Sequence, residues 1–369
     1  MNPFKYGTIV SGEDFCGRKV LIKQLIGSIE ASQRIVLLGE RRIGKSSAVH
    51  EAVLRCNGGR LLYVDLLGIK SIDALCRRIL RAIVISEQKT GWLEKIVKSL
   101  AYLRPSISVD PFTSLPTVSF DASVKLQANS IPEVLTLIES LGKKRKPVVV
   151  FDEFQDILNF EDSYEALALL RSKIQFQSTI PYIFVGSIRR KMDAIFTHHE
   201  SPFFKSAIPM TVAPLPYEEF SQFLSKKFTK GQRKIDDETL EQVFEMANNI
   251  SGDIQQLCEA LWEVTSEKEA IGMDKLKSAL ELIFSREQKS YENYISLLTD
   301  IQHKCLMAIA MEGGKKVFSV AFMKSAGFNN PSTVKKSITR LIKLNILFQR
   351  EDEYRFTNPF FRAWLPHKG

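Results

Sequence analysis

The chain has 369 residues, of which 44% are hydrophobic and 25% charged, and these ordinary fractions exclude an intrinsically disordered or low-complexity protein. Its length predicts about two or three domains. The formal net charge is +9, and residues 291–369 hold 12 lysines and arginines against 6 acidic residues. The basic character is therefore concentrated in the last fifth of the chain, where it favours an acidic partner.

The cysteines and the first residues indicate where the protein works. The five cysteines stand far apart with no C-x-x-C pair, which favours reduced thiols over a zinc site or a disulfide framework. The first residues, MNPFKYG, lack a basic segment followed by an apolar one, and no apolar run approaches the roughly 18 to 20 residues of a membrane span. These features predict a cytoplasmic protein with no membrane partner.

The segment LLGERRIGKSSAV, residues 37–49, contains the pattern of a phosphate-binding loop, G-x-x-x-x-G-K-[ST]. An apolar run precedes the loop and a helical pattern follows it, which is the context that such a loop requires. Backbone N–H groups and the helix N-terminus are expected to wrap the phosphates of a nucleotide. Lys45 would reach the β and γ oxygens, and Ser46 would ligate Mg²⁺. The residues expected to contact the nucleotide in this loop are Gly39, Glu40, Arg41, Arg42, Ile43, Gly44, Lys45, Ser46 and Ser47.

A second motif, PVVVFDEFQD at residues 147–156, supplies the acids that such a loop needs. Four apolar residues, 148–151, are followed by Asp152 and Glu153, as in a Walker B strand. Asp152 would hold the Mg²⁺ shell, and Glu153 would polarise the attacking water. Each motif alone also fits a plain glycine turn or an apolar strand, whereas the pair in this order points to a nucleotide-binding site.

The remaining apolar runs complete an α/β fold. Five runs separated by helical stretches predict a parallel sheet with helices on both faces, namely 34–38, 61–66, 148–151, 181–185 and 208–212. Ser187 follows the fourth run and would lie beside the acids if the two strands are neighbours, although an ordinary strand-end serine is the alternative. Residues 103–126 alternate apolar and polar side chains between prolines, which predicts a β-hairpin insertion at the edge of the sheet.

The last part of the chain changes character. Residues 214–290 are helical in pattern and predict a small all-α lid, and residues 291–369 predict a helix, helix, helix, hairpin order typical of a winged helix. In the third of these helices, an apolar stripe is formed by Val334, Ile338, Leu341 and Ile342. The opposite side carries four basic residues that could contact DNA phosphates and guanines, namely Lys335, Lys336, Arg340 and Lys343. The acidic wing tip at 351–353 would repel DNA, so a role as an internal clamp or as a protein-docking module remains the alternative.

Several segments together resemble a known family. They are NPFKYGTIVSGEDFCGRK, GERRIGKSS, VVVFDEFQD, YIFVGSIRRKM, SGDIQQLCEALW and YRFTNPFFRAWL. With them the chain resembles the archaeal-type ATPases, which belong to the STAND class of AAA+ P-loop NTPases, over nearly its whole length. The resemblance implies an AAA+ module at 1–213, a helical lid at 214–290 and a winged helix at 291–369.

The resemblance also implies roles for individual residues. Gly17 and Arg18 look like the GR pair that sits over the nucleotide, and Ser187 occupies the place of sensor 1. Arg189 or Arg190 is similar to the arginine after sensor 1 that faces the phosphates. The cofactors implied are ATP or ADP with Mg²⁺.

Three functions follow as hypotheses. The first is a slow ATPase that works as a switch: a closed monomer with ADP that opens with ATP, as a monomer or an oligomer, toward an unidentified protein partner. The second is an ATPase of the origin-recognition or transposition-accessory kind, whose turnover is stimulated by duplex DNA. The third is a scaffold or regulator that uses its winged helix without hydrolysing nucleotide.

Overall fold

The computed structural model describes residues 1–56, 59–86, 106–109, 116–119, 125–141, 146–187 and 189–368. They form two compact units, one of Thr8–Pro214 and the other of Met1–Gly7 with Leu215–Gly369. The chain therefore passes between the units twice, once after Gly7 and once after Pro214.

The first unit is built on the predicted five-stranded parallel sheet, which is confirmed. Its strand order is β2-β5-β6-β1-β7, so the strand before the phosphate-binding loop lies next to β6, and β6 lies next to the strand that carries the acids. The strand bounds are Arg34–Leu38 for β1, Arg60–Asp65 for β2, Pro147–Asp152 for β5, Tyr182–Gly186 for β6 and Ile208–Thr211 for β7. The carboxyl ends of β1, β5 and β6 consequently meet at one edge of the sheet.

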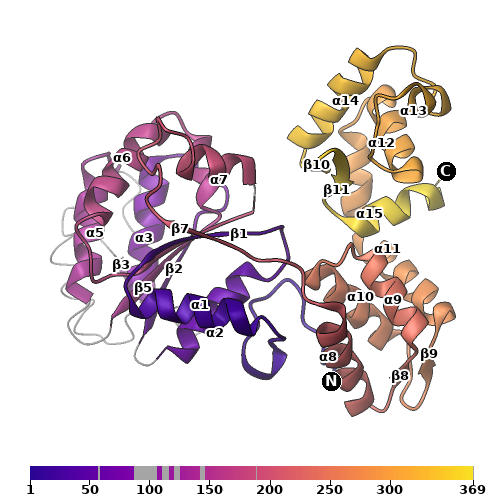
Figure 1. The fold of residues 1–369 in the computed structure, drawn as a ribbon, viewed down its shortest axis with the longest axis horizontal. Coiled ribbons are helices and arrows are strands. Elements are labelled where there is room, and N and C mark those ends of the chain that lie inside the picture. The colour runs from indigo at the N-terminus through magenta and orange to yellow at the C-terminus, as the bar shows by residue number, and fades with distance from the viewer. Residues whose placement is uncertain are drawn as a thin grey trace. The chain divides into compact units, whose positions relative to one another are not determined.

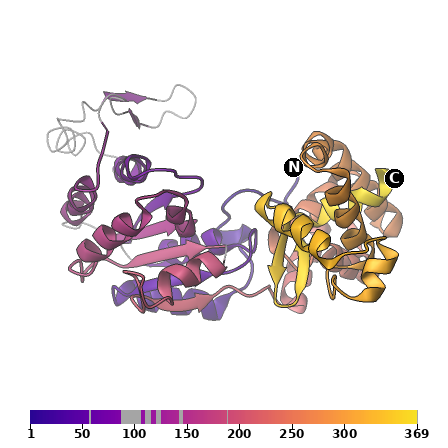
Figure 2. The same ribbon diagram turned by 90° about the horizontal axis from the view of Figure 1, so that it is seen from above.

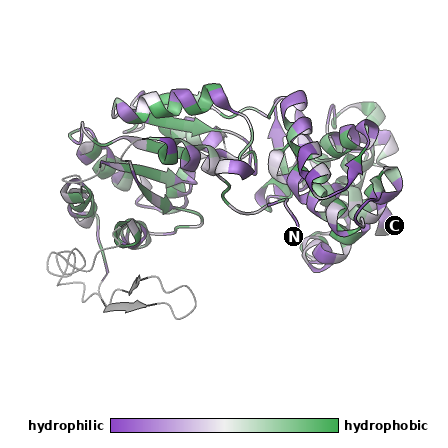
Figure 3. Cartoon of the chain, turned by 90° about the horizontal axis from the view of Figure 1, so that it is seen from below, coloured by the Kyte–Doolittle hydropathy of each residue, from purple (hydrophilic) through white to green (hydrophobic). Residues whose placement is uncertain are grey.

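Helices cover both faces of this sheet (Figures 1 and 2). On one face lie α1 (Lys19–Glu30) and α2 (Lys45–Arg55), preceded by the short 3-10 helix η1 (Gly12–Asp14). The other face carries α3 (Ile72–Ser86), α5 (Ser130–Leu141), α6 (Ser163–Ile174) and α7 (Arg189–Phe196). Every residue of β5 is buried, as a central strand covered on both faces requires, and the strands of the sheet are coloured as hydrophobic in Figure 3.

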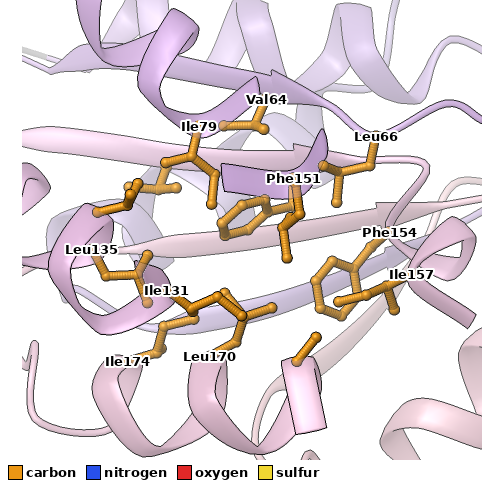
Figure 4. Packing of buried hydrophobic residues seen from close by; sticks show 14 of the residues in the cluster. Val64, Leu66, Ile79, Ile131, Leu135, Phe151, Phe154, Ile157, Leu170 and Ile174 are labelled. Carbon is orange, nitrogen blue, oxygen red and sulfur yellow. The ribbon is translucent and has the colours of Figure 1, made fainter. Parts of the chain in front are cut away.

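A hydrophobic core lies between the sheet and the helices α3, α5 and α6 (Figure 4). Phe151 of β5 lies at its centre, close to Phe154 and Ile157 of the 3-10 helix η3 (Phe154–Asn159). Phe154 also contacts the rings of Phe184, at 4.7 Å between centroids, and Phe203, at 5.6 Å. The turn that follows the Walker B strand is therefore anchored by aromatic packing on its core side.

The predicted hairpin insertion forms, but not where the sequence placed it. Strands β3 (Ser106–Val109) and β4 (Pro116–Ser119) pair antiparallel with each other and form a separate two-stranded sheet. Their placement at the edge of the central sheet was wrong, because β2 and β7 are the edge strands of that sheet and β3 and β4 pair only with each other. The remainder of the 103–126 segment, apart from its final residues 125–126, lies outside the described residues.

The second unit begins with a helical lid of α8 (Tyr217–Lys230), α9 (Asp237–Met246), α10 (Ser251–Glu263) and α11 (Met273–Ser296). It also holds a parallel pair of two-residue strands that the sequence did not indicate, β8 (Lys234–Ile235) and β9 (Ala270–Ile271). Phe4 packs on Phe228 and Trp262, at 4.5 and 6.1 Å between ring centroids, and the Asn2 amide donates to the carbonyl of Glu259 at 3.2 Å. The first seven residues, expected within the ATPase module, thus pack with the lid.

The winged helix follows in the predicted order, with α12 (Asp300–Glu312), α13 (Val320–Ser325), α14 (Pro331–Lys343) and the hairpin of β10 (Leu347–Arg350) and β11 (Glu353–Phe356). Helices α15 (Pro359–Trp364) and η4 (Leu365–Lys368) close the chain. The boundary expected between residues 290 and 291 falls inside α11, a single helix of 24 residues. On α14, Val334, Ile338 and Leu341 are buried, but Ile342 is 39% exposed, because it lies at the edge of the apolar stripe. No helix among the described residues is long and apolar enough to cross a bilayer.

Candidate nucleotide-binding site

The phosphate-binding loop connects β1 to α2 at the carboxyl edge of the sheet. Gly44 caps α2 with a φ of 93°, a left-handed conformation that suits glycine. Gly39 is required for a different reason: a Cβ there would lie 3.1 Å from the carbonyl oxygen of Val212 and from the side chain of Ile43. The loop can therefore turn tightly and aim the N-terminus of α2 at an anion.

Lys45 is almost fully buried in this loop, at 6% exposed. Its ammonium donates to the carbonyl oxygens of Gly39 at 3.0 Å and Glu40 at 2.8 Å. Burial lowers the pKa of Lys45, and the nearby carboxylates of Glu153 and Asp152 oppose this effect. A buried ammonium that contacts neutral carbonyl groups is arranged to accept a phosphate, because the anion would offset the cost of desolvating the charge.

The two residues expected at the metal lie in direct contact. The hydroxyl of Ser46 donates to Oδ2 of Asp152 at 2.6 Å, and the backbone N–H of Glu153 donates to Oδ1 at 2.9 Å. Tyr63 of β2 adds a second hydroxyl, which also donates to Oδ2 of Asp152. A hydroxyl beside a buried carboxylate is a set of hard oxygen ligands, so these residues fit Mg²⁺.

Glu153 lies one residue beyond Asp152, the acid expected at the metal, and has a φ of 50°, which is unusual for a residue other than glycine. Its Oε2 accepts a hydrogen bond from the hydroxyl of Ser187 at 2.8 Å, and the amide of Gln155 donates to the same oxygen. Since β5 and β6 are neighbours, the sheet itself brings Ser187 to the acid. The expected serine is therefore next to Glu153, as the sequence predicts.

The GR pair lies against the loop. Gly17 and Arg18 both adopt left-handed φ values, 66° and 58°. The guanidinium of Arg18 donates to the carbonyl oxygens of Ile43 and Ala213, both at 2.6 Å, and burial lowers the pKa of Arg18 to about 10. Arg18 thus ties the phosphate-binding loop to the segment that leaves β7, and its contact with a nucleotide stays a prediction.

The other residues expected at the nucleotide fall into different environments. Ile43 is buried, Arg41 is half-buried and Arg42 is exposed with a φ of 61°. Ser47 turns its hydroxyl away from the loop and accepts a hydrogen bond from the backbone of residue 10 at 3.1 Å. Arg190 is exposed at the start of α7, whereas the side chain of its neighbour at 189 lies outside the described part of the structure.

Two residues of the site were not predicted. Tyr63 looks like an ordinary strand tyrosine in the sequence. Only the register of β2 against β5, which sets Asp65 opposite Asp152, brings its hydroxyl to the carboxylate of Asp152. Burial, followed by the charge of Asp152, raises the pKa of Tyr63, so the hydroxyl remains a donor at neutral pH. Gln155 lies within the Walker B motif, but nothing in the sequence indicates that its amide contacts Glu153.

The basic residues of α14 are available to a partner. Lys335, Lys336 and Lys343 are exposed and Arg340 is partly exposed, and none of the four forms an ion pair with a described residue. At the wing tip, by contrast, the carboxylate of Glu353 pairs with Arg355 at 2.6 Å. One of the three wing acids is therefore neutralised locally, which weakens the repulsion of DNA that the sequence indicated.

Comparisons with known proteins support this fold. Residues 289–367 match a family model described as a probable winged helix domain. Among curated proteins, none matches the chain. Among solved structures, the chain is similar to a Walker-type ATPase of Pyrococcus abyssi, with 19% identity over 99% of each chain and a TM-score of 0.67.

The chain is also similar to two origin-recognition proteins of Aeropyrum pernix. ORC1, solved in complex with DNA, is 13% identical over 96% of this chain and 94% of its own, with a TM-score of 0.54. ORC2, in ADPNP and ADP complexes, is 11% identical over 95% and 92%, with a TM-score of 0.54. Likeness at these identities concerns the fold alone. The chain has the fold of an AAA+ P-loop ATPase with a C-terminal winged helix.

Proposed function

We propose that the protein binds ATP with Mg²⁺, hydrolyses it slowly and acts as a molecular switch of the STAND class. The observation that carries this proposal is the meeting of Lys45, the Ser46–Asp152 pair and the Glu153–Ser187 pair at one edge of the sheet. These are the groups that phosphoryl transfer to water requires: a phosphate ligand, a metal site and a carboxylate for the nucleophile.

Each group has a distinct part in the proposed reaction. Lys45 and the N-terminus of α2 would bind the phosphates and stabilise the charge that develops on them. Ser46 and Asp152 would hold Mg²⁺, which neutralises charge on the β and γ oxygens when bound. Glu153 would orient the attacking water, while Ser187 keeps its carboxylate on the side of β6. Gly17 and Arg18, with Arg189 or Arg190, complete the proposed set around the nucleotide.

The switch requires that ATP and ADP favour different conformations. A ligand shifts a two-state equilibrium only by its difference in affinity for the two states. The units are joined by the chain after Gly7 and after Pro214, and Arg18 bonds to Ala213 beside the second of these connections. We propose that nucleotide exchange acts through these connections to expose the lid and winged helix to a protein partner.

Hydrogen exchange of the purified protein with ADP, and with a non-hydrolysable ATP analogue, tests the switch. The proposal predicts that amides near residues 7 and 214 exchange at different rates in the two states, and that Lys45→Ala removes the difference because nucleotide no longer binds. Identical exchange in both nucleotides, with binding verified, would leave an ATPase without a switch.

A second function is favoured by the four basic residues of α14, which lack ion-pair partners among the described residues. Under this proposal Lys335, Lys336, Arg340 and Lys343 contact duplex DNA, and the DNA stimulates ATP turnover. The fold shared with ORC1 of Aeropyrum pernix, solved in complex with DNA, supports this reading. Each phosphate contact would release counterions, so binding should weaken steeply with salt.

Fluorescence anisotropy with labelled duplex, measured at several salt concentrations, separates the two functions. Changing Lys335 and Lys336 to glutamine should lower the salt slope by about two if both contact phosphates. Changing Lys226 and Lys230 of α8 instead provides a control of equal charge. If no DNA binds at low salt, this second function is excluded. The switch with a protein partner then remains as the proposed function.

A further inference from the structure

Glu153 has one neighbour, Gln155, to which neither the phosphate-binding loop nor the Walker B acid pair assigns a role. Gln155 is the second residue of η3 and is fully buried, at 0% exposed. Its Nε2 donates to the same Oε2 of Glu153 that accepts the hydroxyl of Ser187. The carboxylate is thus held from two elements, by η3 through Gln155 and by the end of β6 through Ser187.

The orientation of the Gln155 amide is determined by this carboxylate. A flipped amide would place its oxygen against Oε2, with two acceptors face to face. In the observed orientation Oε1 has no hydrogen-bond partner among the described residues. A buried carbonyl oxygen without a hydrogen-bond donor costs free energy. The fold therefore keeps the hydrogen bond from Gln155 to Glu153 in spite of this cost.

The surroundings of Gln155 make room for it and hold it in place. Gly186, the last residue of β6, lies so close that a Cβ there would stand 2.8 Å from Oε1 and 2.4 Å from Cγ of Met192. The preceding residue, Phe154, is fixed in the aromatic core (Figure 4). The backbone that carries Gln155 is therefore anchored, which restricts the directions its amide can take.

We infer that Gln155 is a positioning residue that holds the carboxylate of Glu153 for water activation, and that it contributes to turnover but not to nucleotide affinity. The inference rests on the proposed ATPase function. Among the described residues, Gln155 forms no hydrogen bond with the phosphate-binding loop or with the Ser46–Asp152 pair, and its amide donates to Glu153, the acid assigned to the water. Without that hydrogen bond, the carboxylate of Glu153 should be held by Ser187 alone, and the carboxylate could then turn away from the reacting water.

The test compares two buried glutamines. Gln155→Met keeps the length of the side chain and removes the donor. Gln177→Met is the matched control, because Gln177 is also buried, at 2% exposed, but bonds to Tyr182 and to the carbonyl of Leu135. ATP turnover, affinity for a fluorescent ATP analogue and thermal melting are measured for both variants. Gln155→Asn, whose amide is one carbon too short to reach, is a second variant in case the methionine disturbs folding.

We expect Gln155→Met and Gln155→Asn to lower turnover at least tenfold, equivalent to about 1.4 kcal/mol in activation free energy, with nucleotide affinity unchanged within about twofold. Gln177→Met should lower the melting temperature without this loss of turnover. A loss of turnover with unchanged nucleotide affinity is not expected of a residue that only fills the core.

If the wild type turns over ATP and the Gln155 variants are equally fast, the inference is overturned. It is also overturned if Gln177→Met loses as much turnover as they do. In both cases the proposed ATPase function stands. Loss of nucleotide binding in both Gln155 variants would also overturn it, since the role would then be structural. If the wild type is no faster than Glu153→Gln, the proposed function fails and the inference with it.

Discussion

Tyr63→Phe tests the metal site through a residue that the sequence did not reveal. The change removes one hydroxyl, which donates to Oδ2 of Asp152, and keeps the aromatic ring between its neighbours. Asp152 would retain the hydroxyl of Ser46 on the same oxygen and the N–H of Glu153 on the other. The variant therefore removes one hydrogen bond that orients the carboxylate of Asp152, without removing a proposed metal ligand.

The magnitude follows from these three bonds. A hydrogen bond to a charged group contributes about 1.5 to 3 kcal/mol, and partners that orient a metal ligand typically alter metal affinity about 10- to 100-fold. Because two of the three donors remain on Asp152, we expect the lower end of that range. The Mg²⁺ concentration for half-maximal nucleotide binding should rise about tenfold.

The assay is a Mg²⁺ titration of the binding of a fluorescent ATP analogue, repeated with excess EDTA. Tyr63→Phe should shift the Mg²⁺ midpoint and leave binding in EDTA unchanged. Tyr182→Phe is the control, because its buried hydroxyl bonds to Gln177 near the amino end of β6. A midpoint that is the same in Tyr63→Phe as in the wild type would refute the reasoning, as would an equal shift in the control.

Three further predictions concern Phe4, Gly39 of the phosphate-binding loop and Lys45. Phe4→Ala should destabilise the second unit by about 3 kcal/mol and lower its melting temperature by roughly 10 °C in calorimetry, whereas Phe176→Ala, at a side chain 77% exposed, should change little. Gly39→Ala should weaken nucleotide binding in the same fluorescence assay, because its Cβ would press on Val212, whereas Gly27→Ala, which meets nothing within 4 Å, should not. Burial lowers the pKa of Lys45 from its ordinary 10.5 and a bound phosphate would raise it again. Binding at alkaline pH should therefore take up a proton and weaken as pH rises, which calorimetry in two buffers of different ionisation enthalpy can show; binding by the wild type without proton uptake at alkaline pH would contradict this.

Local patterns were sufficient for much of the fold. The individual strands, the phosphate-binding loop and the acid pair could be predicted because each depends on residues that are neighbours in sequence, such as Gly44 beside Lys45. Ser187 could be placed near Glu153 because parallel strands end at one edge of a sheet.

The rest depends on contacts between distant segments. Tyr63 reaches Asp152 only through the register of β2 against β5, and that register is not written in either strand alone. Phe4 packs on Trp262, more than 250 positions away, so its place with the lid could not be inferred from a segment that looks like a flexible terminus. The helix α11 runs through the expected domain boundary because its pattern does not break at residue 290.

The central claim, that this site hydrolyses ATP, is tested most directly by ATP turnover of the purified protein at low salt, with Mg²⁺, using Glu153→Gln as the blank. The account predicts a slow turnover that requires Mg²⁺ and disappears in Glu153→Gln while ATP still binds. Added duplex DNA in a parallel reaction distinguishes the second function, because stimulation would favour it. A rate equal to that of Glu153→Gln, in protein shown to bind ATP, would contradict the claim.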